Sequence, residues 1–262
     1  MNIVNIGYWE LSIAALLVLS QAALNWRIAR HLSTSMVISM CRMFIQLSLI
    51  ALILTTLFEH VSLPFMVGIA VIMLLAAGFE VTSRQKNKFT QYWGYVIGAG
   101  SMGVSSFMVC IFALAILNVD PWYHPQYAIP LLGMLLGNTL NGTAICMDRL
   151  TESAVRDQKL IEARLLLGHN WLDATETQRH NALHSALIPT INSMAAAGLV
   201  SMPGMMTGQI LAGVDPALAV KYQLFIFMLI AGSTMFSAYV VTLVGTKRLF
   251  DARQRLCLDR LK

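Results

Sequence analysis

The residues of this sequence most able to do chemistry are polar side chains that stand inside long apolar runs. They are Arg42 with Gln46, Asn138 with Asn141, and Asn192 with Ser193. If these runs cross a membrane, each polar group costs free energy and therefore needs a partner or a function. The first pair is four residues apart and the second is three apart, which puts each pair on one face of a helix. We predict that all six residues line a transport path or its gate.

Two of these pairs also have a structural interpretation. Arg42 lies about six residues into its apolar run, a depth of roughly 9 Å at 1.5 Å per residue, and its long side chain can extend back to the membrane surface. Asn138 and Asn141 lie among glycines that include Gly142. Small residues let helices approach closely, and asparagine amides can bond across such contacts. Both pairs are therefore open to a packing role or to a role in the path.

Side chains that can bind metal ions are present, but none forms a recognised motif. His180 and His184 are four residues apart and could share a helical face, yet no Glu stands between them as in HExxH. They equally suit the polar start of a membrane helix. Met202, Met205 and Met206 offer thioethers to a soft metal, or they simply pack. The sequence leaves the metal ligands unknown.

The elements that carry these residues belong to an integral membrane protein. The chain has 262 residues, of which 57% are hydrophobic and 12% are charged, whereas soluble domains average roughly 25% charged residues. The four cysteines form no CxxC pair, which argues against a zinc site or a disulfide framework. No Lys or Arg precedes the first apolar run, so a cleaved signal peptide is not expected.

We predict a single membrane domain, residues 1–262, with about seven transmembrane helices. The spans are expected near residues 8–25, 36–58, 64–81, 94–117, 127–147, 183–202 and 217–244. These runs approach or exceed the roughly 20 apolar residues that cross a bilayer. The predicted fold class is therefore an all-α integral membrane protein.

Basic residues predict the orientation of these spans. Sixteen of the 18 Lys and Arg residues lie in every second connection and in the C-terminal tail, at 26–35, 82–93, 148–182 and 245–262. Basic connections face the cytoplasm, so the N-terminus is predicted outside and the C-terminus in the cytoplasm. Because the membrane topology accounts for the net charge of +5, nucleic acid is not expected as a partner.

The cytoplasmic connection 148–182 contains the pattern of a helix, a glycine turn and a short second helix. Residues 152–167 are predicted helical, and Gly168 is placed to end that helix as a C-cap glycine. Asn170, with Asp173 three residues later, is placed to begin the next helix. Such an element either lies on the membrane surface or docks to a cytoplasmic partner.

The segment 203–216 is predicted to be a short helix at the outer face, interfacial or re-entrant. Gly204, Gly208 and Ala212 recur every four residues, which is the spacing of closely packed membrane helices. Asp215 is placed to cap the last span. We expect this segment to act as a gate. The predicted gate residues are Pro203, Gly204, Met205, Met206 and Gly208.

Motifs along essentially the whole chain form a family pattern. They are ALIPT at 186–190, GLVSMPGMMTGQILAG at 198–213, Asp215-Pro216, KYQ at 221–223, Arg42 with Gln46, Gly133-Met134, Gly137-Asn138 and Leu167-Gly168. With these motifs the chain resembles the FetB-type permeases of iron-exporting ABC transporters. The run EARLLLGHNWLDAT at 162–175 also resembles the start of the EAA loop of ABC permeases, although Pro189 lies further from Gly168 than in that loop.

The resemblance implies a permease subunit that exports iron across the bacterial inner membrane, in metal homeostasis. The EAA-like run implies a coupling helix that docks on an ATPase subunit. Its docking residues are expected to be Glu162, Leu167, Gly168, His169 and Trp171. The chain has no GxxxxGK[ST] loop, so no bound cofactor is expected and a separate cytoplasmic ATPase hydrolyses ATP. Because seven helices do not readily enclose a path, we expect a homodimer.

Two other functions stay open. An ABC permease of the same fold for a different small solute would share every feature above. An intramembrane enzyme would need a Ser/His, paired-Asp or HExxH set at membrane depth, whereas the acidic residues here lie near span ends or in the connection 148–182. The interpretation favoured by the sequence is therefore a transporter subunit and not an enzyme.

Overall fold

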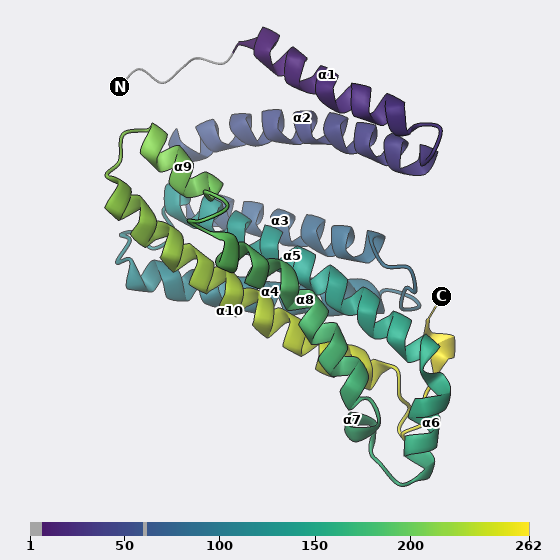
Figure 1. Ribbon diagram of the computed structural model, residues 1–262. Helices are drawn as coiled ribbons and strands as arrows, with labels where there is room; N and C mark the ends of the chain where they lie inside the picture. Colours follow the sequence, from purple (N-terminus) through teal and green to yellow (C-terminus); the bar gives the residue numbers. More distant parts are fainter. Residues whose placement is uncertain (1–6, 60–61, 262) are drawn as a thin grey trace. The chain divides into compact units, whose positions relative to one another are not determined.

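Regular structure in this chain is helical throughout the described ranges. The computed structural model describes residues 7–59 and 62–261, with ten α-helices and one short 3-10 helix (Figure 1). The all-α prediction is confirmed. Contacts divide the chain into two compact units, Met1–Ser62 with Leu211–Gly213, and Leu63–Ile210 with Val214–Lys262.

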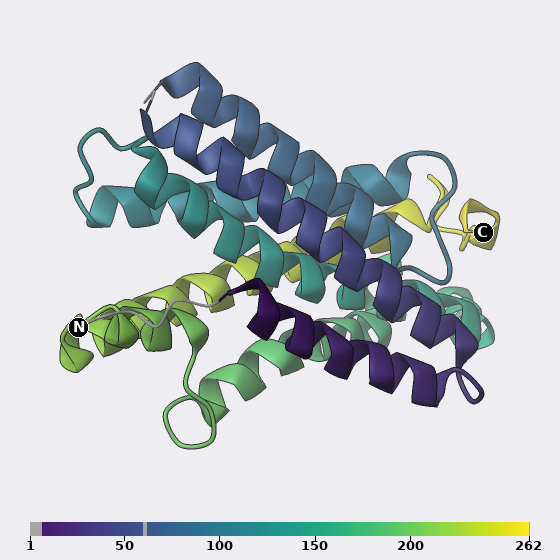
Figure 2. The same ribbon diagram turned by 90° about the horizontal axis from the view of Figure 1, so that it is seen from above.

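The first unit is a hairpin of two helices, α1 (Tyr8–Asn25) and α2 (Arg30–Glu59). They run side by side in both views (Figure 1 and Figure 2). In the turn between them, the Ala29 backbone N–H donates to the carbonyl oxygen of Asn25 at 2.8 Å. Large apolar side chains such as Leu17 and Ile45 are exposed, which suits a surface that faces lipid.

The second unit is a helical bundle built around α5. Its helices are α3 (Leu63–Ser83), α4 (Trp93–Ile116), α5 (Pro125–Arg156), α6 (Gln158–Leu166), α7 (Trp171–Ala174), α8 (Glu176–Ala196), α9 (Gly204–Leu211, all but its last residue) and α10 (Pro216–Arg248), followed by η1 (Leu258–Arg260). The central helix α5 contacts α3, α4, α8 and α10, and α10 also contacts α4 and α8. The facing sides of α5, α8 and α10 therefore define the interior of this unit.

Buried hydroxyl groups join three of these helices. Thr139 Oγ1 lies 2.9 Å from Ser233 Oγ, and Thr143 Oγ1 lies 2.8 Å from Ser237 Oγ. Ser106 of α4 adds an Oγ that is 3.3 Å from Ser233 Oγ. The four-residue spacing on α5 and on α10 brings successive hydroxyls to one face of each helix. Such hydrogen bonds between membrane helices contribute about 0.6 kcal/mol each, up to about 2 kcal/mol.

Gly142 is the point where α5 meets both α8 and α10. A Cβ built on Gly142 would overlap the Cγ2 methyl of Thr234 and would lie 3.3 Å from the carbonyl oxygen of Ala186. Gly142 is therefore a close-packing position, which is one of the two interpretations that the sequence leaves open for this part of α5. Gly137 on the same helix differs, because a Cβ built there meets no atom within 4 Å.

Five helices are long and apolar enough to cross a membrane, within the residues that the structure describes. They are the Arg30–Thr55 part of α2, and α3, α4, α5 and α10. The two other predicted spans, 8–25 and 183–202, correspond to α1 and α8, which are not among these five. The reason at α8 is its polar start, since Glu176, Arg179 and His180 occupy its first turns. Seven spans, and their orientation, therefore stay predictions.

Two predicted boundaries in this unit are wrong. The span expected at 183–202 ends early, because Gly198 has a φ of +85° and its N–H bonds to the carbonyl oxygen of Ser201 at 2.9 Å, which closes a turn after Ala196. The helix expected at 152–167 is interrupted at Asp157, so that its first part continues α5 and the rest forms α6. Buried contacts of Leu150 extend α5 beyond its apolar run.

The basic connections of the second unit gather at one end of its bundle. The Lys86 N–H donates to Asp148 Oδ1 at 3.0 Å, and the Thr90 N–H donates to the carbonyl oxygen of Arg260 at 2.8 Å. The C-terminus and α6 lie at this same end (Figure 1). This grouping is what a bundle crossing a membrane with alternating basic connections requires.

Candidate functional site

Three adjoining cavities lie along α8, the central one between α5, α8 and α10, the second between α5 and α8, and the third between α8, α9 and α10. The central one, about 210 Å³, is lined by Asn138, Asn141, Gly142, Ala186, Pro189, Thr190, Ser193, Phe227 and Ile230. A second, about 310 Å³, shares Asn141 and Pro189 with it, and a third, about 280 Å³, shares Phe227. The three form a row, which we call the cavity row.

Three of the predicted path residues meet in the central cavity, from two different helices. Asn138 Nδ2 donates to the carbonyl oxygen of Met134 at 2.8 Å, and Ser193 Oγ donates to that of Pro189 at 2.8 Å. Each bond holds a polar side chain on its own helix at the cavity wall. Asn141 lines both the central and the second cavity. The wall of this cavity therefore offers neutral amide and hydroxyl groups.

Charged residues close the end of the second cavity. Arg84 Nη1 donates to Asn141 Oδ1 at 2.9 Å, and Arg84 Nη2 lies 3.4 Å from Glu80 Oε1. Asp148 lines the same cavity. The sequence search missed Arg84 because it lies in a connection outside the apolar runs. The four-residue spacing of Glu80 and Arg84 is the signal that marks an ion pair at the end of α3.

The third cavity is lined by thioethers. Met194 of α8, Met206 of α9 and Met228 of α10 contribute to it, together with Pro203 and Gln223. The Gln223 side chain is 7% exposed, and its Oε1 has no hydrogen-bond partner within residues 7–59 and 62–261. Of the predicted gate residues, Pro203 and Met206 therefore line the cavity row.

Other predicted site residues lie elsewhere. Arg42 and Gln46 are exposed on α2, in the first unit. Asn192 is exposed on α8 and lines none of the three cavities. Met205 also lines none of them. Their roles in a path stay predictions.

The segment 203–216, which is predicted to lie at the outer face, contains the expected helix. Residues Gly204–Leu211 are helical, and Asp215 Oδ2 accepts a hydrogen bond from the Leu218 N–H at 3.1 Å, as predicted for the cap of α10. A Cβ built on Gly204 or Gly208 meets no atom within 4 Å. Within residues 7–59 and 62–261 these glycines therefore have no close neighbour, and α9 has no buried residue.

Metal-binding side chains do not cluster in the part of the chain that the structure describes. No three His, Cys, Asp or Glu side chains come together there. His180 and His184 are exposed within the first three turns of α8.

The predicted helix, glycine turn and second helix are present at α6 and α7. Gly168 has a φ of +90°, and its N–H bonds to the carbonyl oxygen of Leu165 at 3.0 Å, while the His169 N–H bonds to that of Arg164 at 3.2 Å. These two bonds define a Schellman motif. Asn170 Oδ1 then accepts from the Asp173 N–H at 3.0 Å, which caps α7.

The turn presents apolar side chains to solvent. Leu166 and Leu167 are 89% and 80% exposed. Glu162 Oε1 accepts from Gln158 Nε2 at 2.8 Å on α6, and Trp171 begins α7. All five predicted docking residues therefore lie on this turn or on the helices that flank it.

Asp157, between α5 and α6, binds this junction to α8. Its Oδ2 accepts from Gln178 Nε2 at 3.1 Å, and its Oδ1 accepts from Arg156 Nε at 2.9 Å. The hydrogen bond from Arg156 lowers the pKa of Asp157, and the bond from Gln178 acts in the same direction. Since the folded-state pKa is lowered, Asp157 stabilises the fold above the ordinary carboxyl pKa and loses this effect as pH falls through the lowered value.

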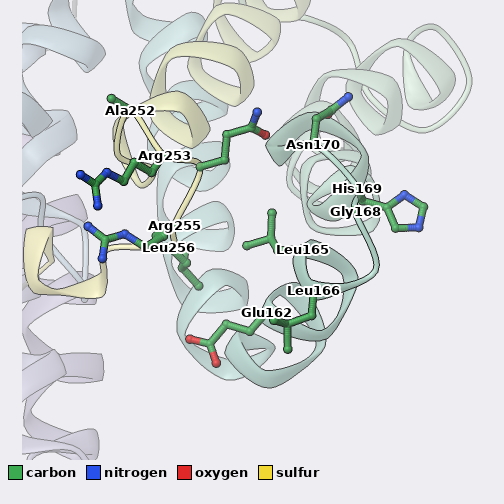
Figure 3. Close-up of a pocket in the computed structure, with 11 residues that line it drawn as sticks. Glu162, Leu165, Leu166, Gly168, His169, Asn170, Ala252, Arg253, Arg255 and Leu256 are labelled. Carbon is green, nitrogen blue, oxygen red and sulfur yellow. The ribbon is translucent and has the colours of Figure 1, made fainter.

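A larger pocket, about 820 Å³, lies between the turn and the C-terminal tail. Glu162, Leu165 and Leu166 line one wall, and residues 252–256 line the other (Figure 3). Figure 3 shows the Leu165 side chain pointing into the space between the two walls. We call this space the tail pocket.

These features define a multi-pass membrane protein, with five candidate spans and an apolar exterior. The chain belongs to the UPF0014 family, described as an uncharacterised protein family, whose model matches residues 8–250.

Its relatives are membrane proteins of bacteria and plants. The chain is 37% identical to the UPF0014 membrane protein slr1647 of Synechocystis, over 71% of this chain and 70% of that protein. It is 31% identical to Protein ALUMINUM SENSITIVE 3 of Arabidopsis thaliana, over 87% and 82% of the two chains. It is 27% identical to the probable iron export permease protein FetB of Escherichia coli, over 100% and 99%. No solved structure matches the chain significantly.

Proposed function

We propose that this chain is the membrane-spanning permease subunit of an ABC transporter that exports iron from the cytoplasm. The observation that carries the proposal is the full-length similarity to the probable iron export permease FetB, over 100% of this chain. The exposed turn between α6 and α7 supports it, because Leu166 and Leu167 offer an apolar surface to a partner.

In this proposal the cavity row is the cargo path. Cargo enters beside Arg84 and Asp148, passes Asn138, Asn141 and Ser193, and leaves through the thioether-lined cavity beside α9. The energy comes from a separate cytoplasmic ATPase, and two copies of the chain assemble in the bacterial inner membrane.

The chain connectivity provides the coupling. The helix α5 continues into α6, and α7 continues into α8. The facing sides of α5 and α8 line the central cavity. An ATPase that displaces the turn between α6 and α7 therefore shifts α5 against α8 and changes the cavity between them.

The test uses inverted membrane vesicles that contain the chain together with a cytoplasmic ABC-type ATPase subunit from the same genome. We expect ATP-dependent accumulation of radioactive iron inside these vesicles. Gly168→Pro should insert normally and abolish accumulation, because proline cannot adopt the φ of +90° at this turn. The matched control is Gly137→Ala, which changes a glycine with open space around it. Normal accumulation by Gly168→Pro, or none by the unchanged chain, would contradict the proposal.

A second candidate is a permease of the same fold for a different small solute. The lining of the central cavity favours it, since Asn138, Thr190 and Ser193 offer neutral groups, whereas iron in its hard oxidation states prefers charged oxygen ligands. The same vesicles decide this point. ATP-dependent uptake of another metal or of an organic solute, without iron uptake, would show that iron is not the cargo. The assignment of the chain as a permease would then still hold.

A further inference from the structure

The C-terminal tail, residues 249–261, has a defined fold of its own. Asp251 Oδ1 accepts from the backbone N–H groups of Arg253 and Arg255 at 2.9 and 2.8 Å. Asp251 Oδ2 also lies 2.8 Å from the Arg255 guanidinium. The Cys257 N–H returns to the carbonyl oxygen of Leu249 at 2.8 Å. These bonds hold the tail in one conformation, so that its surface is already formed before a partner binds.

The tail also binds the start of α7. Gln254 Oε1 accepts from the Trp171 backbone N–H at 3.1 Å, and the Trp171 ring lies 6.4 Å from that of Phe250. Gln254 has a φ of +59°, a conformation that is uncommon for residues other than glycine. The side chain of Gln254 thus satisfies an orphan donor at the N-terminus of α7.

The other end of the tail is bound to the bundle. Arg260 Nη1 donates to the carbonyl oxygens of Arg248 and Phe250 at 2.7 and 3.0 Å. Phe89, in the connection between α3 and α4, pairs with Leu261. The tail therefore links the turn between α6 and α7 to the end of α10 and to the connection between α3 and α4.

The tail pocket joins these two surfaces. Leu165 lies at its centre, and Leu256 lines the opposite wall. Figure 3 shows Arg253 and Arg255 side by side on the tail wall, with both side chains pointing away from α6. The pocket thus has an apolar floor, and the outer side of its tail wall carries the Arg253 guanidinium, whereas the Arg255 guanidinium is paired with Asp251.

We propose that the tail is the second wall of the ATPase docking site. This inference rests on the proposed function. The occupant is a segment of the ATPase subunit that inserts an apolar side chain between the turn and the tail, with an acidic side chain next to it that reaches Arg253 on the outer side of the tail. Charge complementarity of this kind governs association rate and specificity. A docked ATPase then acts on α10 through Gln254 and Phe250, as well as on α5 and α8 through the turn.

The binding test uses the full-length chain in nanodiscs and the same ABC-type ATPase subunit, purified. Arg253→Glu reverses a charge on the tail wall and should weaken ATPase binding at least tenfold at low salt. Lys247→Glu is the matched control, because Lys247 is exposed in the last turn of α10 and does not line the tail pocket. It should change the affinity less than threefold. Equal affinity of Arg253→Glu and the unchanged chain would overturn the inference.

The coupling test uses Gln254→Gly. This change removes the bond to Trp171, yet glycine adopts a positive φ without strain, so the tail keeps its own fold. We expect the ATPase to bind and hydrolyse ATP while cargo moved per ATP falls at least threefold. Unchanged coupling would overturn the role of the tail in transmission. If the unchanged chain binds no ATPase, the proposed function itself fails. If the ATPase binds and the tail variants change neither binding nor coupling, only the inference about the tail fails.

Discussion

Two glycines on one helix differ in what surrounds them. Gly142 faces the Thr234 methyl and the Ala186 carbonyl oxygen, whereas Gly137 faces open space. Both positions are glycine, and both lie in the predicted span 127–147. The difference arises because Gly142 lies where α5 meets two neighbouring helices.

Gly142→Ala should therefore destabilise the folded chain by about 1–3 kcal/mol, as overpacking of a filled core does. Gly137→Ala should be neutral or slightly stabilising. Alanine lowers the conformational entropy of the unfolded chain, which can raise the free energy of unfolding by about 0.4–1 kcal/mol. Thermal unfolding in detergent measures both. Adding Thr234→Ser to Gly142→Ala removes the overlapping methyl and should restore stability. A double variant no more stable than Gly142→Ala would contradict this packing.

Two asparagines also differ in their surroundings. Asn138 lines the central cavity and donates from Nδ2 to the carbonyl oxygen of Met134 on its own helix, whereas Asn192 lines no cavity of the row. Asn138→Ala should lower transport about tenfold, the effect of losing roughly one hydrogen bond of 1.4 kcal/mol to the cargo. Asn192→Ala should be close to the unchanged chain. Vesicle transport at equal protein level measures the difference, and the reverse order would remove the cavity row as the path.

At the scale of elements, the capping and turn residues in the sequence predicted several helix ends correctly. The turn at Gly168, the cap at Asn170 and the cap at Asp215 all form as predicted. Each depends on atoms within about four residues. The end of α8 was misplaced, because Ala197–Ser201 is as apolar as the helix before it and only the Gly198 turn shows the break.

The helix α9 allows a prediction about assembly. Since Gly208 has no atom within 4 Å of a built Cβ, Gly208→Leu should leave the stability of the single chain unchanged. If α9 packs against the second copy of a homodimer, the same change should weaken dimers and reduce transport. Analytical ultracentrifugation in detergent separates the two effects. Met205→Leu, which roughly conserves volume, is the control. A stable, fully active Gly208→Leu dimer would exclude α9 from both the interface and the gate.

At the scale of the whole molecule, the orientation can be measured directly. Gln126 and Gln158 are both exposed and lie in connections predicted to face opposite sides of the membrane. In a chain whose exposed Cys41 and half-buried Cys257 are replaced by serine, a cysteine at Gln126 should react with an impermeant thiol reagent from outside. A cysteine at Gln158 should react only after the membrane is opened. The reverse pattern would invert the predicted topology.

The sequence by itself determined the membrane class, the all-α fold and the main helix starts, because composition and caps act locally. It also marked Asn138, Asn141 and Ser193 as polar residues within apolar runs. Only the tertiary structure decided that these three line one cavity and that Asn192, beside Ser193, does not.

Only the tertiary structure decided three further features. They are the bond from Arg84 to Asn141, the close contact at Gly142, and the bond between Gln254 and Trp171. Each joins residues that are far apart in the chain. Their proximity follows from how α3, α5, α8 and α10 pack, and the spacing of residues within one helix carries no information about which neighbour that helix will meet.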